Sequence, residues 1–114
     1  MNDYIDLGRI GELEEVMGAG AVAIVSSMLE NMTAAIDELE LAMAAGDLDR
    51  ATQAAHRCRN DALMLGARQL LSALTELEAA TRGPDGSGAG AALARVREVW
   101  PPTRDELAAS SNPP

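Results

Sequence analysis

The chain has 114 residues, a length typical of one domain, and a formal net charge of −9 at pH 7. All nine basic residues are arginine, against eighteen acidic residues, so a basic surface able to bind a nucleic-acid backbone is not expected. A single cysteine and a single histidine exclude a disulfide framework, a cysteine-based zinc cluster and a histidine-rich metal site. The composition therefore predicts a small, acidic, helix-rich domain.

No segment of the sequence predicts export or insertion into a membrane. The N-terminus lacks the positively charged region of a signal peptide. The longest apolar run, Ala19 to Val25, is far shorter than the roughly 20 residues that a spanning helix needs. An unpaired cysteine also fits a reducing compartment. We therefore expect a cytoplasmic protein with no membrane contact.

Apolar residues recur at steps of three and four along almost the whole chain, which is the spacing of one face of an α-helix. The pattern predicts a short first helix that is broken at Gly18, and a second helix from about Ala21 to Ala45. Gly46 is suited to end the second helix in the left-handed conformation, and Asp47 to cap the next one. The predicted apolar stripe of the second helix is Val25, Met28, Leu29, Met32, Ile36, Leu39 and Met43.

The third predicted helix starts after Asp47 and carries mostly small apolar residues at alternating steps of three and four. This coiled-coil-like spacing predicts packing against other helices and not against a sheet. Gly66 loosens the end of the third helix, and a fourth helix follows. The predicted core residues of the two helices are Leu48, Ala51, Ala55, Cys58, Ala62 and Leu65, then Ala67, Leu70, Leu71, Leu74, Leu77 and Thr81.

A loop is predicted at Gly83 to Gly88 from its composition, and a fifth helix after it. Pro101 and Pro102 each lack a backbone donor, so we expect them to break this helix, with a short helix from Thr103 to Ala109 beyond. Residues 110–114 are expected to form a disordered tail. The predicted fold class is all-α: residues 1–109 form one domain, an antiparallel four-helix bundle with a short additional N-terminal helix.

His56, the single imidazole of the chain, is predicted to lie on the outside of the third helix. At 100° per residue it points about 130° away from the centre of the apolar seam. Arg59 follows at i+3, within side-chain reach on the same helix. An exposed imidazole with a guanidinium beside it is therefore expected, and a solvated surface histidine is the simpler alternative.

Glu78 is the predicted partner of His56. The two residues are each eleven positions from Ala67, so an antiparallel hairpin of the third and fourth helices places them at the same level. A carboxylate there could accept the Nδ1–H of His56 and leave Nε2 as an outward-facing nucleophile. The alternative for Glu78 is a solvated charge at the flank of its helix.

The segment from Ala54 to Ala67, AAHRCRNDALMLGA, resembles the signature of the histidine-containing phosphotransfer (HPt) family. The resemblance covers roughly Tyr4 to Trp100 and includes Glu78, at a position where family members commonly place a Glu or Gln that hydrogen-bonds the histidine. Two positions depart from the family pattern. Arg59 stands in the usual place of a lysine and keeps the positive charge, in a larger, forked geometry. Asn60 stands in the usual place of a glycine, where it could crowd the approach to the imidazole or donate a hydrogen bond to a phosphoryl oxygen.

The resemblance implies a phosphocarrier of a two-component phosphorelay. His56 would accept a phosphoryl group from a receiver domain and return it to another, with Arg59 as its charge partner, Glu78 orienting the ring and Asn60 beside the phosphoryl site. The expected partners are a response regulator receiver domain, a hybrid histidine kinase, or both. Mg²⁺ is expected in the partner receiver domain, and no cofactor is expected in this chain.

The sequence also bears on kinase activity, on oligomeric state and on alternative functions. No Gly-rich ATP loop is recognisable, so no kinase activity of its own is expected, and the chain is expected to be a monomer. Because Asn60 replaces the usual glycine, a non-phosphorylated adaptor of the same fold that binds a receiver or a histidine kinase is the alternative function. A helical dimerisation domain with unrelated partners is a third possibility, which rests on composition alone.

Overall fold

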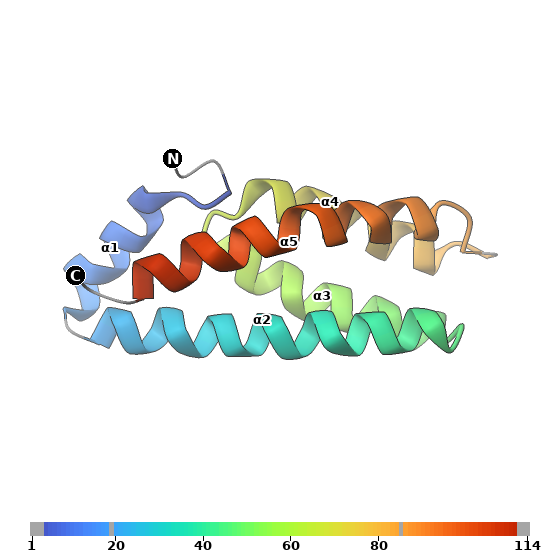
Figure 1. The fold of residues 1–114 in the computed structure, drawn as a ribbon, viewed down its shortest axis with the longest axis horizontal. Helices are drawn as coiled ribbons and strands as arrows, with labels where there is room; N and C mark the ends of the chain where they lie inside the picture. The colour runs from blue at the N-terminus through green and yellow to red at the C-terminus, as the bar shows by residue number, and fades with distance from the viewer. Residues whose placement is uncertain (1–3, 19, 85, 112–114) are drawn as a thin grey trace.

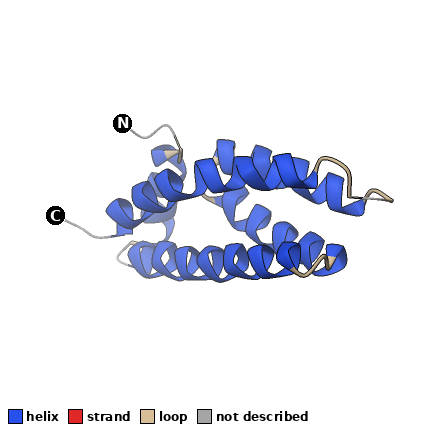
Figure 2. Cartoon of the chain, turned by 45° about the vertical axis from the view of Figure 1, so that its right-hand side comes forward, coloured by secondary structure: helices blue, strands red, loops and turns tan. Residues whose placement is uncertain are grey.

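The computed structural model describes residues 4–18, 20–84 and 86–111, and all regular structure in these ranges is helical (Figure 2). The predicted all-α fold class is therefore confirmed. Within the same ranges, no helix combines the length and the apolar character that crossing a membrane requires. The helices are α1 (Leu7–Met17), α2 (Gly20–Ala44), α3 (Leu48–Met64), α4 (Arg68–Arg82) and α5 (Ala89–Ser111).

The helices form a bundle in which α2 contacts α3 and α5, and α4 contacts the same two helices. Figure 1 shows that successive helices from α2 to α5 run in alternating directions along the long axis. The short α1 packs against α2 at the end of the molecule where α3 passes into α4. This arrangement leaves the outer faces of α3 and α4 side by side and open to a partner.

The core is built from small residues on α3 and larger ones on its neighbours. Ala51, Ala55, Cys58 and Ala62 of α3 are completely buried, as the sequence pattern predicts. The large side chains that fill the space around them come from α2, α4 and the end of α3: Met32, Leu39, Leu65, Leu70, Leu74 and Leu77. Because α3 contributes little side-chain volume, its backbone can approach α2 and α4 closely.

The predicted end of α2 at Gly46 and the predicted start of α3 at Asp47 are both confirmed. Gly46 has φ +71°, the left-handed conformation that glycine adopts at low cost, and the Asp47 carboxylate accepts a hydrogen bond from the Arg50 backbone N–H at 3.1 Å. At the other end, Gly66 has φ +67° and lies directly against Asp6 of the N-terminal segment. The Asp6 backbone N–H also donates to the Leu65 carbonyl at 3.4 Å, so this turn holds the start of the chain in place.

The predicted break at Pro101 and Pro102 is wrong, because α5 continues through both prolines to Ser111. Two prolines remove only two hydrogen bonds of the helix, and contacts beyond them hold the next turns in helical conformation. The Thr103 hydroxyl donates to the Val99 carbonyl at 2.6 Å, and Leu107 is completely buried. In addition, a Glu106 carboxylate oxygen accepts hydrogen bonds from the backbone N–H groups of residues 4 and 5 at 3.2 and 3.3 Å.

The end of the chain differs in part from the prediction. Residues 110 and 111, which were expected to belong to a disordered tail, continue α5. The rest of the predicted tail, residues 112–114, lies outside the described residues. The described residues of the loop predicted at Gly83 to Gly88, which are 83–84 and 86–88, are non-helical and lie between α4 and α5.

Replacing Gly66 with alanine should cost more stability than the same replacement at Gly46. Both positions have positive φ, where a residue with a Cβ pays about 1–2 kcal/mol. A Cβ at Gly46 meets open space, whereas one at Gly66 would overlap the Asp6 side chain. We expect Gly46→Ala to lower the free energy of unfolding by about 1 kcal/mol and Gly66→Ala by at least about twice as much. Urea denaturation of both variants measures the difference, and equal losses would contradict the described packing of the N-terminal segment on this turn.

Candidate functional site

Glu78 is an acidic side chain with only 3% of its surface exposed, at the interface of α3 and α4. The alternative of a solvated flank charge is therefore wrong for this residue. Glu78 follows the completely buried Leu77, and α3 presents small residues on the side that faces α4. The close approach of the two helices covers a flank position that larger residues on α3 would have left in solvent.

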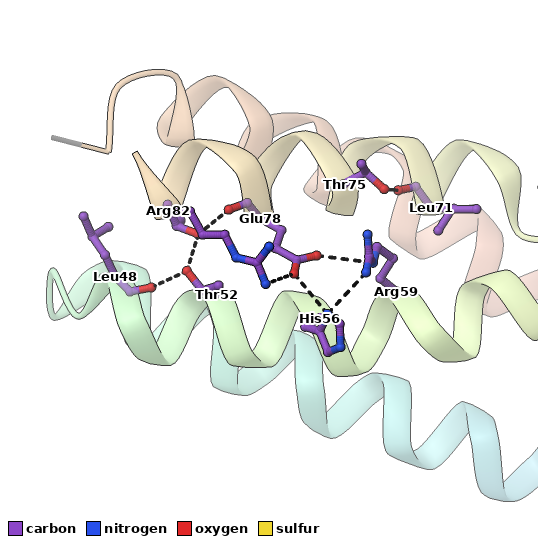
Figure 3. Close-up of polar contacts among 9 residues, drawn as sticks. Leu48, Thr52, His56, Arg59, Leu71, Thr75, Glu78 and Arg82 are labelled. Carbon is purple, nitrogen blue, oxygen red and sulfur yellow. Dashed lines mark hydrogen bonds and ion pairs between the residues drawn. The ribbon is translucent and has the colours of Figure 1, made fainter. Parts of the chain in front are cut away.

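Three nitrogen-bearing side chains surround the Glu78 carboxylate (Figure 3). Its Oε1 atom lies 3.0 Å from His56 Nδ1 and 2.7 Å from the Arg82 guanidinium. Its Oε2 atom lies 3.2 Å from Arg59 Nε, an ion-pair distance, and has no hydrogen bond to any residue in the described part of the chain. A buried carboxylate is stable only when charged or hydrogen-bonding groups compensate for its loss of water. Here α3 supplies two of these groups and α4 supplies the third.

The contacts of His56 Nδ1 assign the tautomer of the ring. Nδ1 lies 3.0 Å from Glu78 Oε1 and 3.3 Å from an Arg59 guanidinium nitrogen. These contacts have opposite requirements, because the carboxylate accepts a hydrogen from Nδ1 whereas the guanidinium can only donate to a lone pair on it. The shorter contact to a charged acceptor assigns the proton to Nδ1. Nε2 then holds the lone pair, on a side chain of which 45% is exposed.

A hydroxyl pair one turn away from the site holds α3 and α4 in register. The Thr52 and Thr81 hydroxyl oxygens lie 2.6 Å apart across the interface. Thr81 is buried, and its hydroxyl is also 3.1 Å from the carbonyl oxygen of Glu78. Thr52 and His56 are four residues apart on α3, so the pair fixes the height at which His56 meets Glu78.

The predicted site residues divide into two groups in the structure. His56, Arg59 and Glu78 come together in one network. Asn60 is exposed and lies instead in a shallow groove between α2 and α3, together with Asn31 and Arg57. Its place beside a phosphoryl group therefore remains a prediction.

Two members of the site, Arg82 and Thr52, are not predicted by the spacing of the sequence. Arg82 follows Glu78 at i+4, a spacing at which a glutamate and an arginine pair on one helix face. That signal is present in the sequence, where Glu78 is the only acidic residue followed by an arginine at i+4, but such a pair is commonly solvated and does not by itself indicate a site. Thr52 carries no signal of its own, because a threonine on a helix flank is common.

The neighbouring polar groups include no candidate metal site in the described ranges, where no three His, Cys, Asp or Glu side chains are grouped to hold an ion. Cys58, two residues after His56 and on the core side of α3, is a free thiol. Burial raises the pKa of this thiol to about 12, with a smaller contribution from Asp61. Cys58 is therefore a neutral core residue at physiological pH and not a nucleophile.

Comparison with known proteins agrees with this geometry. The model of the Hpt domain family matches residues 23–109, which include most of α2 and all of α3 and α4. The crystal structure of histidine-containing phosphotransfer protein B (HptB) from Pseudomonas aeruginosa PAO1 superposes with a TM-score of 0.87 at 20% sequence identity, covering 97% of this chain and 96% of that one. At this identity the likeness establishes a shared fold. None of the curated protein sequences compared with this chain matches it.

A helical bundle that presents a half-exposed histidine, backed by a buried carboxylate, defines a class of histidine phosphotransfer modules. The match over residues 23–109 shows that the chain belongs to the Hpt domain family, whose members work with receiver domains and histidine kinases in phosphorelay signalling.

The buried thiol of Cys58 should make folding stability fall in alkaline solution. The unfolded thiol ionises above about pH 9, whereas the folded one stays neutral until about pH 12. Within that window the unfolded state binds fewer protons than the folded state, so the free energy of unfolding falls by up to about 1.4 kcal/mol per pH unit from this group. The contribution is complete below pH 9 and is lost as the pH rises towards 12.

Urea denaturation at several pH values, with Cys58→Ala as the control, measures this effect. The variant keeps every other titrating group and should lack the additional slope above about pH 9. Parallel pH profiles for the two proteins would contradict a buried, neutral thiol.

Proposed function

We propose that His56 is the phosphoryl-carrying residue of this chain, and that it exchanges the group with aspartate residues of receiver domains. The single observation that carries the proposal is the contact of His56 Nδ1 with the buried Glu78 carboxylate at 3.0 Å. The chain belongs to the Hpt family and contains a single histidine, His56. Its exposed position on the shared face of α3 and α4 is suited to a protein partner.

The transfer step follows from the tautomer of His56. The Nε2 lone pair attacks the phosphorus of an aspartyl phosphate, the bond from phosphorus to the aspartate oxygen breaks, and the aspartate leaves as a carboxylate. The new Nε2–P bond makes the ring cationic for as long as Nδ1 keeps its proton. Glu78, which accepts that proton's hydrogen bond, therefore stabilises a positive charge that is absent before the reaction. The reverse transfer uses the same contacts.

Arg59 is proposed as the charge partner of the phosphoryl group. It lies at i+3 from His56, with about a third of its side chain exposed. A phosphoryl group adds about 1.5 to 2 negative charges, which a neighbouring guanidinium offsets. Phosphoryl transfer depends mainly on alignment and on charge stabilisation, so the chain needs no further chemistry of its own. The receiver domain is proposed to supply Mg²⁺.

The setting of this exchange is part of the proposal. The four helices α2 to α5, with their alternating directions, act as an antiparallel four-helix scaffold that holds His56 and Glu78 on facing helices. The chain acts as a monomer between a receiver domain and a second receiver or a hybrid histidine kinase. We place the exchange in the cytoplasm, where a free cysteine such as Cys58 stays reduced.

Replacing His56 with glutamine should abolish phosphorylation without unfolding the bundle. Receiver domains from the same genome, each labelled with radioactive acetyl phosphate, are mixed with the chain. The native protein should gain an acid-labile, alkali-stable phosphate, and His56→Gln should gain none. Circular dichroism of the variant should show native helix content, since the His56 side chain is about half exposed. Persistent label in the folded variant would contradict the assignment of His56 as the phosphoryl-carrying residue.

A second candidate function, a non-phosphorylated adaptor, is favoured by one observation: Asn60 is exposed one turn beyond His56 on α3, where the family has glycine. If the Asn60 side chain crowds an incoming receiver, Asn60→Gly should raise the rate of phosphotransfer severalfold. The substitution costs roughly a few tenths of a kcal/mol in helix propensity, which the bundle tolerates.

The same labelling assay distinguishes the possibilities. A higher rate in Asn60→Gly indicates that crowding limits transfer, and a lower rate indicates that Asn60 donates a hydrogen bond to the phosphoryl group. The adaptor function requires receiver binding that survives His56→Ala together with no label in either the native chain or Asn60→Gly.

A further inference from the structure

Arg82 shares a single carboxylate oxygen with the proposed phosphoacceptor. Its guanidinium lies 2.7 Å from Glu78 Oε1, the same atom that lies 3.0 Å from His56 Nδ1 (Figure 3). We propose that Arg82 is a positioning residue that sets the tautomer of His56 through Glu78. The relevance of that tautomer to phosphotransfer rests on the proposed function, whereas the tautomer itself can be measured without it.

The negative charge of Glu78 depends on the groups around it. The side chain is 3% exposed, so water does not stabilise its carboxylate. Oε2 has an ion pair with Arg59 and no hydrogen bond within the described chain. Oε1 is therefore the better compensated oxygen, and its strongest partner by distance is Arg82. Arg82 is the only one of the three partners that lies on the same helix as Glu78 and so follows it without depending on the α3–α4 interface.

Loss of Arg82 would leave the Glu78 carboxylate with one neighbouring cation fewer. A buried carboxylate with one cation fewer has two ways to relieve its charge: it binds a proton, or it turns out towards solvent. A protonated carboxyl can offer its O–H to Nδ1, and a displaced one no longer reaches the ring. Both outcomes remove the acceptor that keeps a proton on Nδ1. The fraction of rings with a free lone pair on Nε2 then falls.

Arg59 does not replace Arg82 in setting the tautomer of His56. One of its guanidinium nitrogens lies 3.3 Å from His56 Nδ1, where a donor stabilises a lone pair on Nδ1 and hence a proton on Nε2. The two arginines therefore act on the ring in opposite directions. Arg82 pairs with the carboxylate, whereas Arg59 contacts both the carboxylate and the ring. Without Arg82, the contact from Arg59 favours the tautomer that is not nucleophilic at Nε2.

A purely structural role of Arg82 predicts a smaller effect of its replacement. Arg82 lies in the last turn of α4, where a cation interacts favourably with the helix dipole, and 64% of its side chain is exposed. If this were its whole role, its replacement would lower stability slightly and leave the imidazole unchanged. The nitrogen chemical shifts of His56 are a readout that separates the two roles.

The experiment uses the full chain with ¹⁵N-labelled histidine, at a pH of about 8.5, where a free imidazole is neutral. In the native protein the shifts should report a proton on Nδ1. Arg82→Gln should shift the equilibrium towards a proton on Nε2 and lower the rate of phosphotransfer severalfold, and Arg82→Lys should restore much of both. The control is Arg95→Gln, which removes the same charge from an exposed ion pair. In that pair Arg95 of α5 lies 2.9 Å from Glu76 of α4.

A second background tests whether Arg82 acts through Glu78. In Glu78→Gln the acceptor of Nδ1–H is a neutral amide oxygen, which needs no cation beside it. Adding Arg82→Gln to this variant should change the ring shifts much less than it does in the native background. An equal change in both backgrounds would overturn the proposal, as would native-like shifts in Arg82→Gln alone.

The proposed function of His56 and the positioning role of Arg82 can fail separately. If the native chain takes up no phosphoryl group while Arg82→Gln still changes the tautomer, the proposed function fails and the positioning role stands. If the native chain is phosphorylated on His56 while Arg82→Gln behaves like Arg95→Gln in both the ring shifts and the rate, the positioning role fails and the proposed function stands.

Discussion

A carboxylate held out of water between two helices is the interaction on which this site depends. Glu78 is buried at the α3–α4 interface, and an uncompensated charge there would be strongly destabilising. Its ion pairs with Arg59 and Arg82 compensate the charge, and its contact with His56 places a proton on Nδ1 of the imidazole. The same contacts therefore stabilise the bundle and leave the lone pair of the imidazole on Nε2. In the proposed function, this lone pair is the nucleophile.

The rest of the fold determines where that carboxylate lies. Small residues on α3 let α4 approach closely enough to cover Glu78, and the Thr52–Thr81 hydroxyl pair fixes the relative height of the two helices. The turn at Gly66 joins α3 to α4 and receives the N-terminal segment, so the hairpin that carries the site is held at its closed end. Two of the nine arginines of the chain, Arg59 and Arg82, pair with this carboxylate.

Most of the helices and the central pair of the site are predictable from the sequence, for identifiable reasons. Helical periodicity is a local signal, and the equal distance of His56 and Glu78 from Ala67 follows from counting along an antiparallel hairpin. The burial of Glu78 and the role of Arg82 depend on how closely two helices approach, which spacing does not reveal. The continuation of α5 through Pro101 and Pro102 depends on a contact between Glu106 and the backbone of residues 4 and 5, at the opposite end of the chain.

The central claim is that Glu78 holds the Nδ1 proton of His56, so that phosphorus bonds to Nε2. The direct measurement is the coupling between ¹⁵N and ³¹P in ¹⁵N-histidine-labelled protein, after phosphorylation by a phosphorylated receiver domain. Coupling to Nε2, with Nδ1 still protonated and hydrogen-bonded, is the predicted result. Coupling to Nδ1, or a phosphoryl group attached to any other residue, would contradict the account.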